Sequence, residues 1–586
     1  MVYQSSGDEV SVLVLPAWLP GSYMIRDFSK NLSDISVVDP QGNILGIHKK
    51  DKQTWHVDAC TGEVTVSYRV YAWDMSVRTA YIDQTRAYFN GSSLFLRLMT
   101  QESLRHQLFL ESPQAFNWTV STTMPKLNVD EQGFGVYEVS DYDEFIDYPF
   151  EIGNQQSCSF TISNVEHQMV FSDAIDCDLQ RIAQDVSPIC AEHVAMFGEL
   201  PVQQYLFMTL ATADGYGGLE HCDSTSLICK RMDLPHVQMV TSTKGYRQFL
   251  ALCSHEYFHL WNVKRIKPAV FQNNLLTEET HTELLWAFEG ITSYYDELAL
   301  VRSGRLDAKE YLGMLAPTVT RVIRAKGRFR QTVAESSFDA WTKFYKQDEN
   351  SPNAICSYYA KGGLVAFGLD HLLRTESSDR LCLDDLMRHL WRKFGKTQTG
   401  IPERGIEHEV SELLGQPVDA FFSAYIYGTE ELPLKDWFAD FGIGYRLTAT
   451  DDLTNLGGYS SDLGESLEQK PSFGARTAVV NGMLHVQQVF TGGAAQQAGV
   501  APGDILLALD KEQCTHENLL LLLGRKSFGK PSELTLFRRN RLMTLSYIPT
   551  LAELDTCQLW LLDDVDKPVM ARRQSWFSSS VSGKHT

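Results

Sequence analysis

The sequence predicts a multidomain α+β protein, in which a β-rich first domain precedes a mainly helical domain and a small β domain. Three observations lead to this expectation. At 586 residues the chain is too long for one hydrophobic core. Short alternating stretches broken by Gly, Pro, Asp and Asn fill the first part, and helical periodicity begins near residue 178. A polar, glycine-rich stretch near residue 460 then separates a last group of strand-like segments.

The pattern of each part sets the expected boundaries. We place the β-rich domain at residues 1–163, with strands near residues 10–14, 64–70, 93–98 and 159–162. We place the helical domain at residues 164–453, with helices near residues 246–263, 278–302, 307–316 and 362–373. A linker at 454–471 leads to a small β domain at 472–550, and residues 551–586 are expected to be a tail, frayed from Ala571 onward where serines accumulate.

Composition excludes several classes of protein. The formal net charge is -21, so the chain lacks the excess of basic residues with which nucleic-acid-binding proteins contact phosphates. No run of about 18 apolar residues is present, so no membrane span is expected. The 11 cysteines form no CxxC pairs and indicate neither a disulfide scaffold nor a cysteine-ligated metal. Because no export signal is visible, we expect a cytoplasmic protein, and a start further upstream would leave the periplasm open.

The segment His255-Glu256-Tyr257-Phe258-His259 has the spacing of a metal site on a helix. Residues four apart lie on one helical face, so both imidazoles can bind one ion. Glu256 is then placed to take a proton from a water on the metal. Apolar residues surround the motif and no proline follows before Pro268, which favours a helix. The structural alternative is a pair of histidines on a half-buried helix.

A catalytic zinc needs a third protein ligand, and Glu289 is the candidate. It lies in an otherwise apolar stretch, where a carboxylate requires a partner such as a cation. Asp296 follows seven residues later on the same helical face, so it can hold the free nitrogen of a ligand histidine. The alternative for Glu289 is an ordinary glutamate on a helix surface.

These motifs resemble those of known peptidases. The HExxH segment followed by Glu289-Gly290 and Asp296 is similar to the glutamate-zincins (gluzincins), which include thermolysin and aminopeptidase N. The longer segments at residues 15–28 and 255–268 resemble the corresponding sequences of the glycyl aminopeptidase family of metalloproteases. The resemblance implies a thermolysin-like catalytic domain, a Zn2+ cofactor, and peptide substrates with small N-terminal residues such as Gly or Ala.

Two further segments carry roles that the resemblance implies. Tyr359-Ala360-Lys361-Gly362 is similar to the Tyr-x-Lys-Gly of aminopeptidase N relatives, which gives Tyr359 the role of donor to the oxyanion. Gly217-Gly218-Leu219-Glu220 looks like their substrate-cleft strand, which gives Glu220 the role of binding the free amine, with Gly217 and Gly218 beside it. The alternatives are a packed aromatic at a helix start and an ordinary turn and strand.

The segment at residues 492–506 resembles the signature of PDZ domains of the bacterial protease type. Such domains add a peptide to a sheet edge and hold its C-terminal carboxylate on backbone N–H groups. By position, the carboxylate loop is Phe473-Gly474-Ala475, and the helix at residues 516–523 closes the groove. A purely architectural domain is the alternative.

The sequence as a whole favours a zinc aminopeptidase in which His255, His259 and Glu289 bind zinc and Glu256 is the general base. Two rival hypotheses about the function remain. The first is a zinc endopeptidase, which would cut peptides with a blocked N-terminus. The second is a peptide-binding scaffold with a structural zinc, which would not need the base Glu256.

Overall fold

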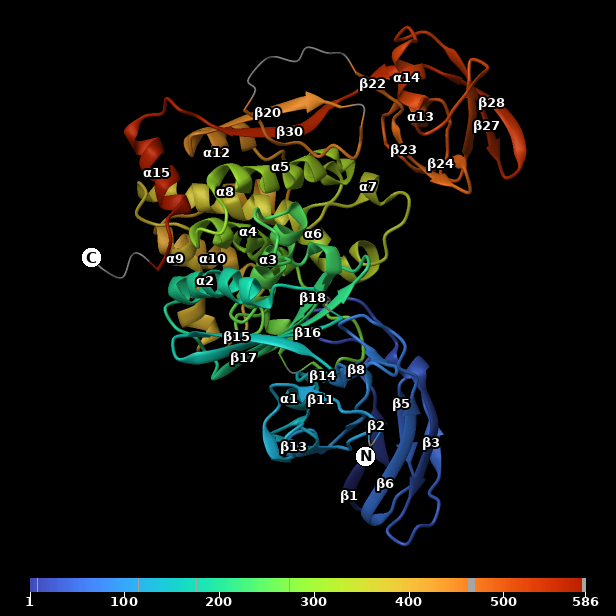
Figure 1. The fold of residues 1–586 in the computed structure, drawn as a ribbon, viewed down its shortest axis with the longest axis vertical. Coiled ribbons are helices and arrows are strands. Elements are labelled where there is room, and N and C mark those ends of the chain that lie inside the picture. Colours follow the sequence, from blue (N-terminus) through green and yellow to red (C-terminus); the bar gives the residue numbers. More distant parts are fainter. Residues whose placement is uncertain are drawn as a thin grey trace. The chain divides into compact units, whose positions relative to one another are not determined.

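The computed structural model describes residues 1–7, 9–113, 115–173, 176–272, 274–450, 452–461 and 470–581 (Figure 1). It contains two compact units, one of residues 1–281, 387–402 and 579–586 and one of residues 282–386 and 403–578. Parts of the expected linker (462–469) and of the expected tail (582–586) lie outside the described residues. The predicted order of a β-rich region, a helical region and C-terminal sheets is confirmed.

The first unit begins with four small antiparallel sheets, ordered β1-β6-β3, β4-β5-β2-β9, β11-β14-β8-β7 and β10-β13-β12. Their strands are β1 Val2–Ser6, β2 Ser11–Val14, β3 Leu32–Val38, β4 Ile47–Lys49, β5 Thr54–Val57, β6 Thr61–Val70, β7 Ala80–Ile82, β8 Arg86–Phe89, β9 Arg97–Leu98, β10 His106–Leu110, β11 Thr119–Ser121, β12 Lys126–Val129, β13 Gly135–Val139 and β14 Phe150–Gly153. The strand expected at 93–98 is shorter, because Gly91–Ser93 forms a 3-10 turn capped by Asn90. The short helix α1 Tyr142–Ile146 precedes β14.

A five-stranded sheet follows in the same unit, ordered β15-β16-β17-β19-β18. Its strands are β15 Gln156–Ile162, β16 Val165–Ser172, β17 Gln204–Thr212, β18 Gly217–Glu220 and β19 Ser224–Lys230. The three central strands are parallel and rich in buried apolar residues, as expected for strands covered by helices. The predicted boundary at residue 163 falls between β15 and β16, which form one antiparallel pair.

Two helices pack on this sheet, α2 Leu179–Phe197 against β15 and α3 Lys244–Phe258 against β18 and β19 (Figure 1). Each begins at a capping side chain, Asp178 for α2 and Thr243 for α3. The buried face of α3 carries Phe249, Leu252 and Tyr257 among others, so burial of this apolar face fixes the helix on the sheet.

The second unit is helical up to residue 440. Its elements are η5 Trp286–Gly290, α4 Ile291–Arg302, α5 Ala308–Arg324, η6 Lys326–Phe329, α6 Val333–Phe338, η7 Ala340–Phe344, α7 Ser351–Ala354, α8 Ala360–Ser377, α10 Gly405–Leu414, α11 Asp419–Tyr425 and α12 Leu434–Asp440. The chain also forms α9 Leu383–Leu390 and η8 Trp391–Gly395. Among the described helices, none combines the length and the apolar character needed to cross a membrane.

The C-terminal part of this unit holds three sheets, ordered β20-β30-β21, β22-β29 and β23-β24-β25-β27-β28 with β26 paired to β25. The elements are β20 Ile443–Ala449, β21 Gly458–Tyr459, β22 Pro471–Ser472, β23 Ala475–Val480, β24 Met483–Val489, α13 Ala494–Gln497, β25 Ile505–Leu509, β26 Glu512–Gln513, α14 Leu519–Gly524, β27 Ser532–Arg538, β28 Arg541–Tyr547, β29 Thr550–Leu551, β30 Leu554–Leu561 and α15 Lys567–Phe577. The segment expected to be a tail therefore contains β30 and α15, and the frayed end expected from Ala571 is wrong as far as Phe577.

Candidate active site

Both histidines of the HExxH segment lie at the C-terminal end of α3. His255 is in the last turn, and His259 is the residue that caps the helix end. Their ring centroids are 4.7 Å apart, with the ring planes at 87°. His259 is buried and His255 is half-buried. The helix therefore presents two imidazoles on one face, as the spacing of four residues requires.

The orientation of the His259 ring is set by the turn that follows α3. His259 Nδ1 lies 2.6 Å from the backbone carbonyl of Asn262, and a carbonyl can only accept a hydrogen bond. The proton therefore resides on Nδ1, and Nε2 keeps the lone pair that a metal would bind. The sequence did not single out Asn262, because its contribution is a backbone atom that carries no side-chain signal.

Glu256 lies on α3 beside strand β18. Ligand atoms of Glu220, Glu256 and His259 all lie within 4.8 Å of one another, which makes them a candidate metal-binding group of His and Glu side chains. A Cβ atom on Gly218 would approach Glu256 Oε1 to 2.1 Å, so only glycine leaves room for this carboxylate. Gly217 has φ +152°, a conformation that favours glycine. A Cβ atom added to Gly217 would have no other atom within 4 Å.

Glu220 ends β18 and reaches a cavity of about 730 Å3 in the first unit. Its side chain is buried, and its Oε1 forms no hydrogen bond with any residue that the structure describes. A Cβ atom on Gly21 would lie 2.6 Å from both carboxylate oxygens. The segment at residues 15–28 thus lines part of this cavity, with Trp18 and Tyr23 among the lining residues.

In the second unit, Glu289 lies in the π-helical turn η5 and is buried. The sequence predicted a continuous helix over residues 278–302, but regular α-helix begins only at Ile291. Such π turns often accompany functional side chains. Gly290 packs against the backbone of Gly362 on α8, where a Cβ atom would lie 2.6 Å from the Gly362 carbonyl carbon.

Asp296 and Tyr359 line one cavity of about 210 Å3 in the second unit. Asp296 lies on α4 next to Glu297, whose pKa is raised by burial and by the neighbouring Asp296 charge. Tyr359 precedes α8, and its hydroxyl lies 3.0 Å from the hydroxyl of Tyr345. The Tyr359 ring also stacks on Phe344, at a centroid distance of 5.5 Å. These contacts fix the tyrosine at the cavity wall.

The fold and these side chains define a metallopeptidase, and comparison with known proteins gives its family. The M61 N-terminal domain matches residues 1–154, and the M61 glycyl aminopeptidase family matches residues 248–365. An aminopeptidase N family protein from Idiomarina loihiensis is 37% identical, with a TM-score of 0.92 over 98% of this chain and 96% of that one. The chain therefore belongs to the M61 glycyl aminopeptidases.

Two other solved structures are less similar to this chain in sequence and in fold. An M1 zinc metallopeptidase from Deinococcus radiodurans is 12% identical, with a TM-score of 0.44 over 72% of this chain and 87% of that one. The native yeast LTA4 hydrolase is 14% identical, with a TM-score of 0.45 over 74% of this chain and 65% of that one. No curated protein matches the chain.

Proposed function

We propose that this metallopeptidase is a zinc-dependent aminopeptidase that removes N-terminal residues from peptides. The observation that carries the proposal is the position of Glu220: a buried carboxylate with an unbonded oxygen, close to Glu256 and His259. In a peptide the free amine and the first carbonyl carbon are separated by one atom. An amine bound by Glu220 therefore brings the first peptide bond to the base Glu256.

The proposed zinc ligands are His255, His259 and Glu289. One carboxylate and two imidazoles form the donor set that catalytic zinc sites commonly use. His259 fits this role, because its Nδ1 donates to Asn262 and its Nε2 is left for the metal. We assign Asp296 to hold the ring nitrogen of a ligand histidine that does not bind the metal. Because the Asn262 carbonyl already holds that nitrogen in His259, the histidine that Asp296 would hold is His255. When bound, zinc supplies a Lewis acid that polarises the peptide carbonyl.

The other site residues act on the substrate. Glu256 takes the proton of the attacking water and passes it to the leaving amine, while Gly218 leaves space for its carboxylate. Tyr359 donates its hydroxyl proton as a hydrogen bond to the oxygen that becomes negative in the transition state. Glu220 pairs with the substrate ammonium group, which selects peptides with a free N-terminus. The family resemblance favours Gly or Ala as the first residue.

The test compares free and N-acetylated peptides on the wild type and on Glu220→Ala, with zinc content measured throughout. We expect about one zinc per chain, loss of activity on chelation, and retained zinc in Glu220→Ala and Glu256→Gln. Glu256→Gln should lose roughly a hundredfold to ten-thousandfold in turnover. Acetylation and Glu220→Ala should each cost activity and together cost little more than either alone, because both remove one shared interaction.

Each rival reading gives a different result in this test. Undiminished cleavage of acetylated peptides would identify an endopeptidase. Loss of zinc in Glu220→Ala would show that Glu220 is a metal ligand, as its proximity to His259 also permits. Zinc retention with full activity in Glu256→Gln would contradict the assignment of the base. A zinc-loaded wild type that binds peptides and hydrolyses none would instead identify a peptide-binding scaffold with a structural zinc.

We also propose that the C-terminal sheet of residues 475–547 binds a peptide C-terminus. Strand β23 is an edge of this sheet among the described residues, and an edge can accept an added strand. Gly474 precedes β23 with φ +78°, beside the backbone of Ala494 and Ala495. Binding of a labelled peptide with a free C-terminal carboxylate, and not of its C-terminal amide, is the expected result. Equal binding of both would remove the carboxylate site from the proposal.

A further inference from the structure

The proposed amine-binding residue Glu220 has a cation as its neighbour in the same cavity. Lys264 lies in the turn after α3, only 9% of its side chain is exposed, and it lines the cavity with Glu220. The negative charge of Glu220 is among the influences that keep the Lys264 ammonium protonated. Nevertheless, neither an ion pair nor a hydrogen bond joins the two side chains among the described contacts.

Asp147 holds Lys264 instead. Its Oδ1 lies 2.8 Å from Lys264 Nζ. Two further donors bind the same carboxylate, His221 through Nδ1 at 3.2 Å and Cys222 through its backbone N–H at 2.9 Å. Burial raises the pKa of Asp147, but Lys264 and these hydrogen bonds outweigh burial and hold the pKa well below its usual range. Asp147 is therefore an anion at any pH at which the enzyme is expected to work.

We propose that Asp147 is a positioning residue of the amine site: by holding the Lys264 ammonium, it leaves Glu220 available to the ammonium group of a peptide. The inference rests on the proposed role of Glu220. Glu220, Asp147 and Lys264 together carry one net negative charge, which matches one incoming ammonium group. Lys267, Asp141, Asp143 and Glu144 also line the cavity, but none of them forms an ion pair or hydrogen bond with Glu220 or Lys264 among the described contacts.

After Asp147, Glu220 is the carboxylate whose charge acts most strongly on the Lys264 ammonium, so it is the expected partner of Lys264 once the Asp147 charge is removed. A pair between these two residues would occupy the oxygen that the substrate needs, and a bound peptide would first have to displace the lysine. The loss would then appear in substrate binding and much less in the chemical step, because Lys264 does not touch the reacting bond. Asp147 also holds the turn after β18 through Cys222, so the same carboxylate fixes the backbone that carries Glu220.

The experiment uses the zinc-loaded full chain and four variants. Asp147→Asn keeps an oxygen that can accept from Cys222 N–H but removes the charge, and it should raise KM for a free-amine peptide about tenfold to a hundredfold with little change in kcat. Asp147→Asn combined with Lys264→Met restores the net charge of the site and should recover most of the loss. Lys264→Met alone should not raise KM. Asp143→Asn is the matched control, because Asp143 lines the same cavity without contacting Lys264, and its KM should be unchanged.

The outcomes separate this inference from the proposed function. If the wild type cleaves acetylated and free peptides equally, Glu220 does not bind an amine and both ideas fail. If the free amine is required but the double variant is as impaired as Asp147→Asn, Asp147 acts through the fold and the positioning role is wrong. If Asp147→Asn does not fold, Lys264→Met decides: a tenfold increase in its KM would show that Lys264 supports binding and would overturn the proposal.

Discussion

At the scale of single residues, the hydroxyl of Tyr359 has the most specific predicted effect. Replacing Tyr359 by Phe removes one donor aimed at charge that develops in the transition state, while the ring can still stack on Phe344. We expect turnover to fall on the order of a hundredfold or more, with little change in KM. Tyr345→Phe is the control, because it removes the hydroxyl next to Tyr359 and leaves the proposed donor in place. A change in KM alone for Tyr359→Phe would show that this residue only helps to hold the substrate.

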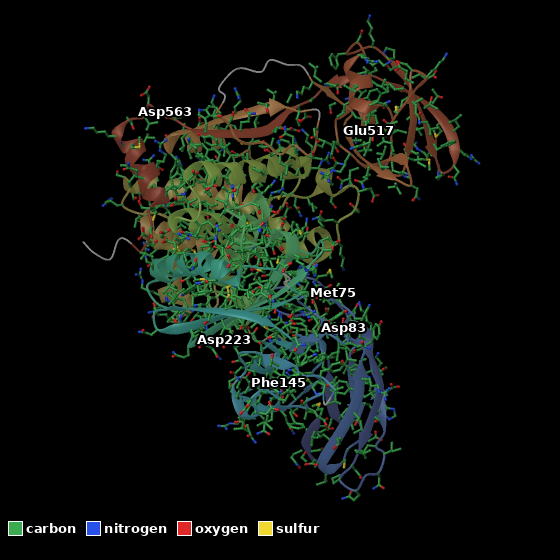
Figure 2. The ribbon with its side chains drawn as sticks, viewed as in Figure 1. Met75, Asp83, Phe145, Asp223, Glu517 and Asp563 are labelled. Carbon is green, nitrogen blue, oxygen red and sulfur yellow. The ribbon has the colours of Figure 1, made fainter. Side chains whose placement is uncertain are left out.

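Asp223, which follows β18 (Figure 2), makes stability depend on pH. Burial raises its pKa to about 7, more than the hydrogen bond from Thr123 lowers it. Since an unfolded aspartate has a pKa near 3.9, the folded state binds more protons between these values, and stability falls as pH rises from about 4 to 7. Asp223→Asn keeps an acceptor for Thr123 and lacks the charge.

We therefore expect Asp223→Asn to have a higher Tm than the wild type at pH 8. The difference should shrink as the pH is lowered toward 4, where Asp223 is protonated in the folded protein. The stabilisation should be no more than a few kcal/mol, as a shift of this size allows. Thermal unfolding of both proteins at several pH values measures it. A difference in Tm that is the same at pH 4 and pH 8 would contradict a raised pKa.

How much of the site the sequence could predict depends on sequence separation. The pair His255 and His259 follows from helix periodicity, which is a local property. The pairing of Asp147 with Lys264 joins residues 117 positions apart, and the contact of Gly21 with Glu220 joins the first β-rich region to β18. No local pattern signals such contacts, because they depend on how the sheets and α3 fold together.

At the scale of elements, close packing of η5 and α8 is set by glycines. A Cβ atom on Gly290 would lie 2.6 Å from the Gly362 carbonyl carbon and 2.9 Å from the carbonyl oxygen of Tyr358. Backbone atoms cannot move aside, so Gly290→Ala should destabilise the protein by roughly 1–3 kcal/mol. The matched control is Gly363→Ala on α8, whose Cβ would meet its neighbours at 3.5–3.7 Å, an ordinary contact.

The control should be neutral or slightly stabilising, because alanine favours a helix over glycine by up to about 1 kcal/mol. Denaturant unfolding of the three proteins compares their midpoints. Equal stability of Gly290→Ala and the wild type would show that η5 and α8 can separate without cost. The sequence predicted a helix over residues 278–302 but not the π-helical turn η5 at its start. A π-helical turn contains one residue more than an α-helical turn and leaves the apolar pattern unchanged. It depends instead on the packing of Gly290 on α8, which no local pattern signals.

At the scale of the whole molecule, the order of domains is predictable from periodicity, but the end of the chain is not. Serines at 575 and 578–580 suggested a frayed terminus. The structure instead shows α15 packed into the second unit, with Trp576 fully buried. The apolar residues of α15 fall in two groups, at 569–571 and 576–577, and do not gather on one helical face, so the local signal for burial is too weak to detect.

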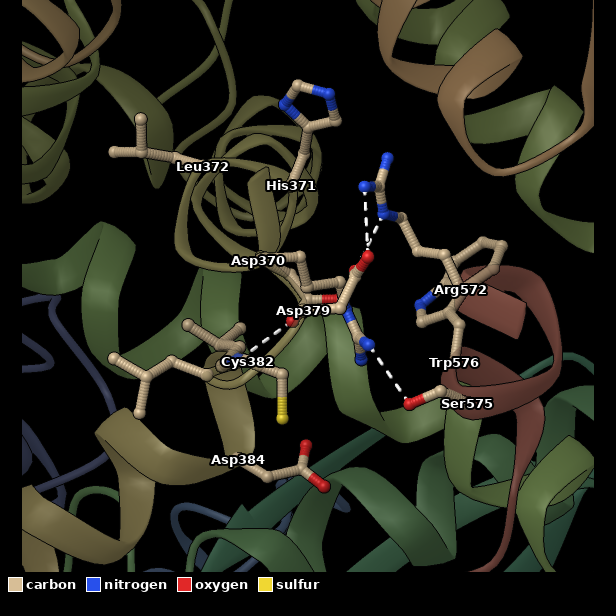
Figure 3. Close-up of polar contacts among 12 residues, drawn as sticks. Asp370, His371, Leu372, Asp379, Cys382, Asp384, Arg572, Ser575 and Trp576 are labelled. Atoms are coloured by element: carbon tan, nitrogen blue, oxygen red, sulfur yellow. Dashed lines mark hydrogen bonds and ion pairs between the residues drawn. The ribbon is translucent and has the colours of Figure 1, made fainter. Parts of the chain in front are cut away.

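The surroundings of α15 explain why it is ordered (Figure 3). The indole N–H of Trp576 donates to the Tyr294 hydroxyl at 2.7 Å, and its backbone carbonyl accepts from Arg302 at 3.0 Å. Its ring contacts Tyr311, at a centroid distance of 5.6 Å. Arg374 donates to Ser575 at 3.1 Å from the neighbouring helix α8. Helix α15, the last helix among the described residues, thus completes the core of the second unit.

We expect Trp576→Ala to lower the free energy of unfolding of the second unit by about 3–5 kcal/mol, because it empties a fully buried indole site and leaves the Tyr294 hydroxyl without its donor. Arg572→Ala, one turn earlier on α15, is the control. It removes a bidentate ion pair with the partly exposed Asp379 and a hydrogen bond to the Asp440 carbonyl, which together should cost about 1–2 kcal/mol, less than the loss of the indole. Denaturant unfolding followed by circular dichroism gives both values. Equal effects of the two substitutions would mean that the Arg572 contacts hold α15 as strongly as the indole does, and Trp576 would then not be the main anchor of the helix.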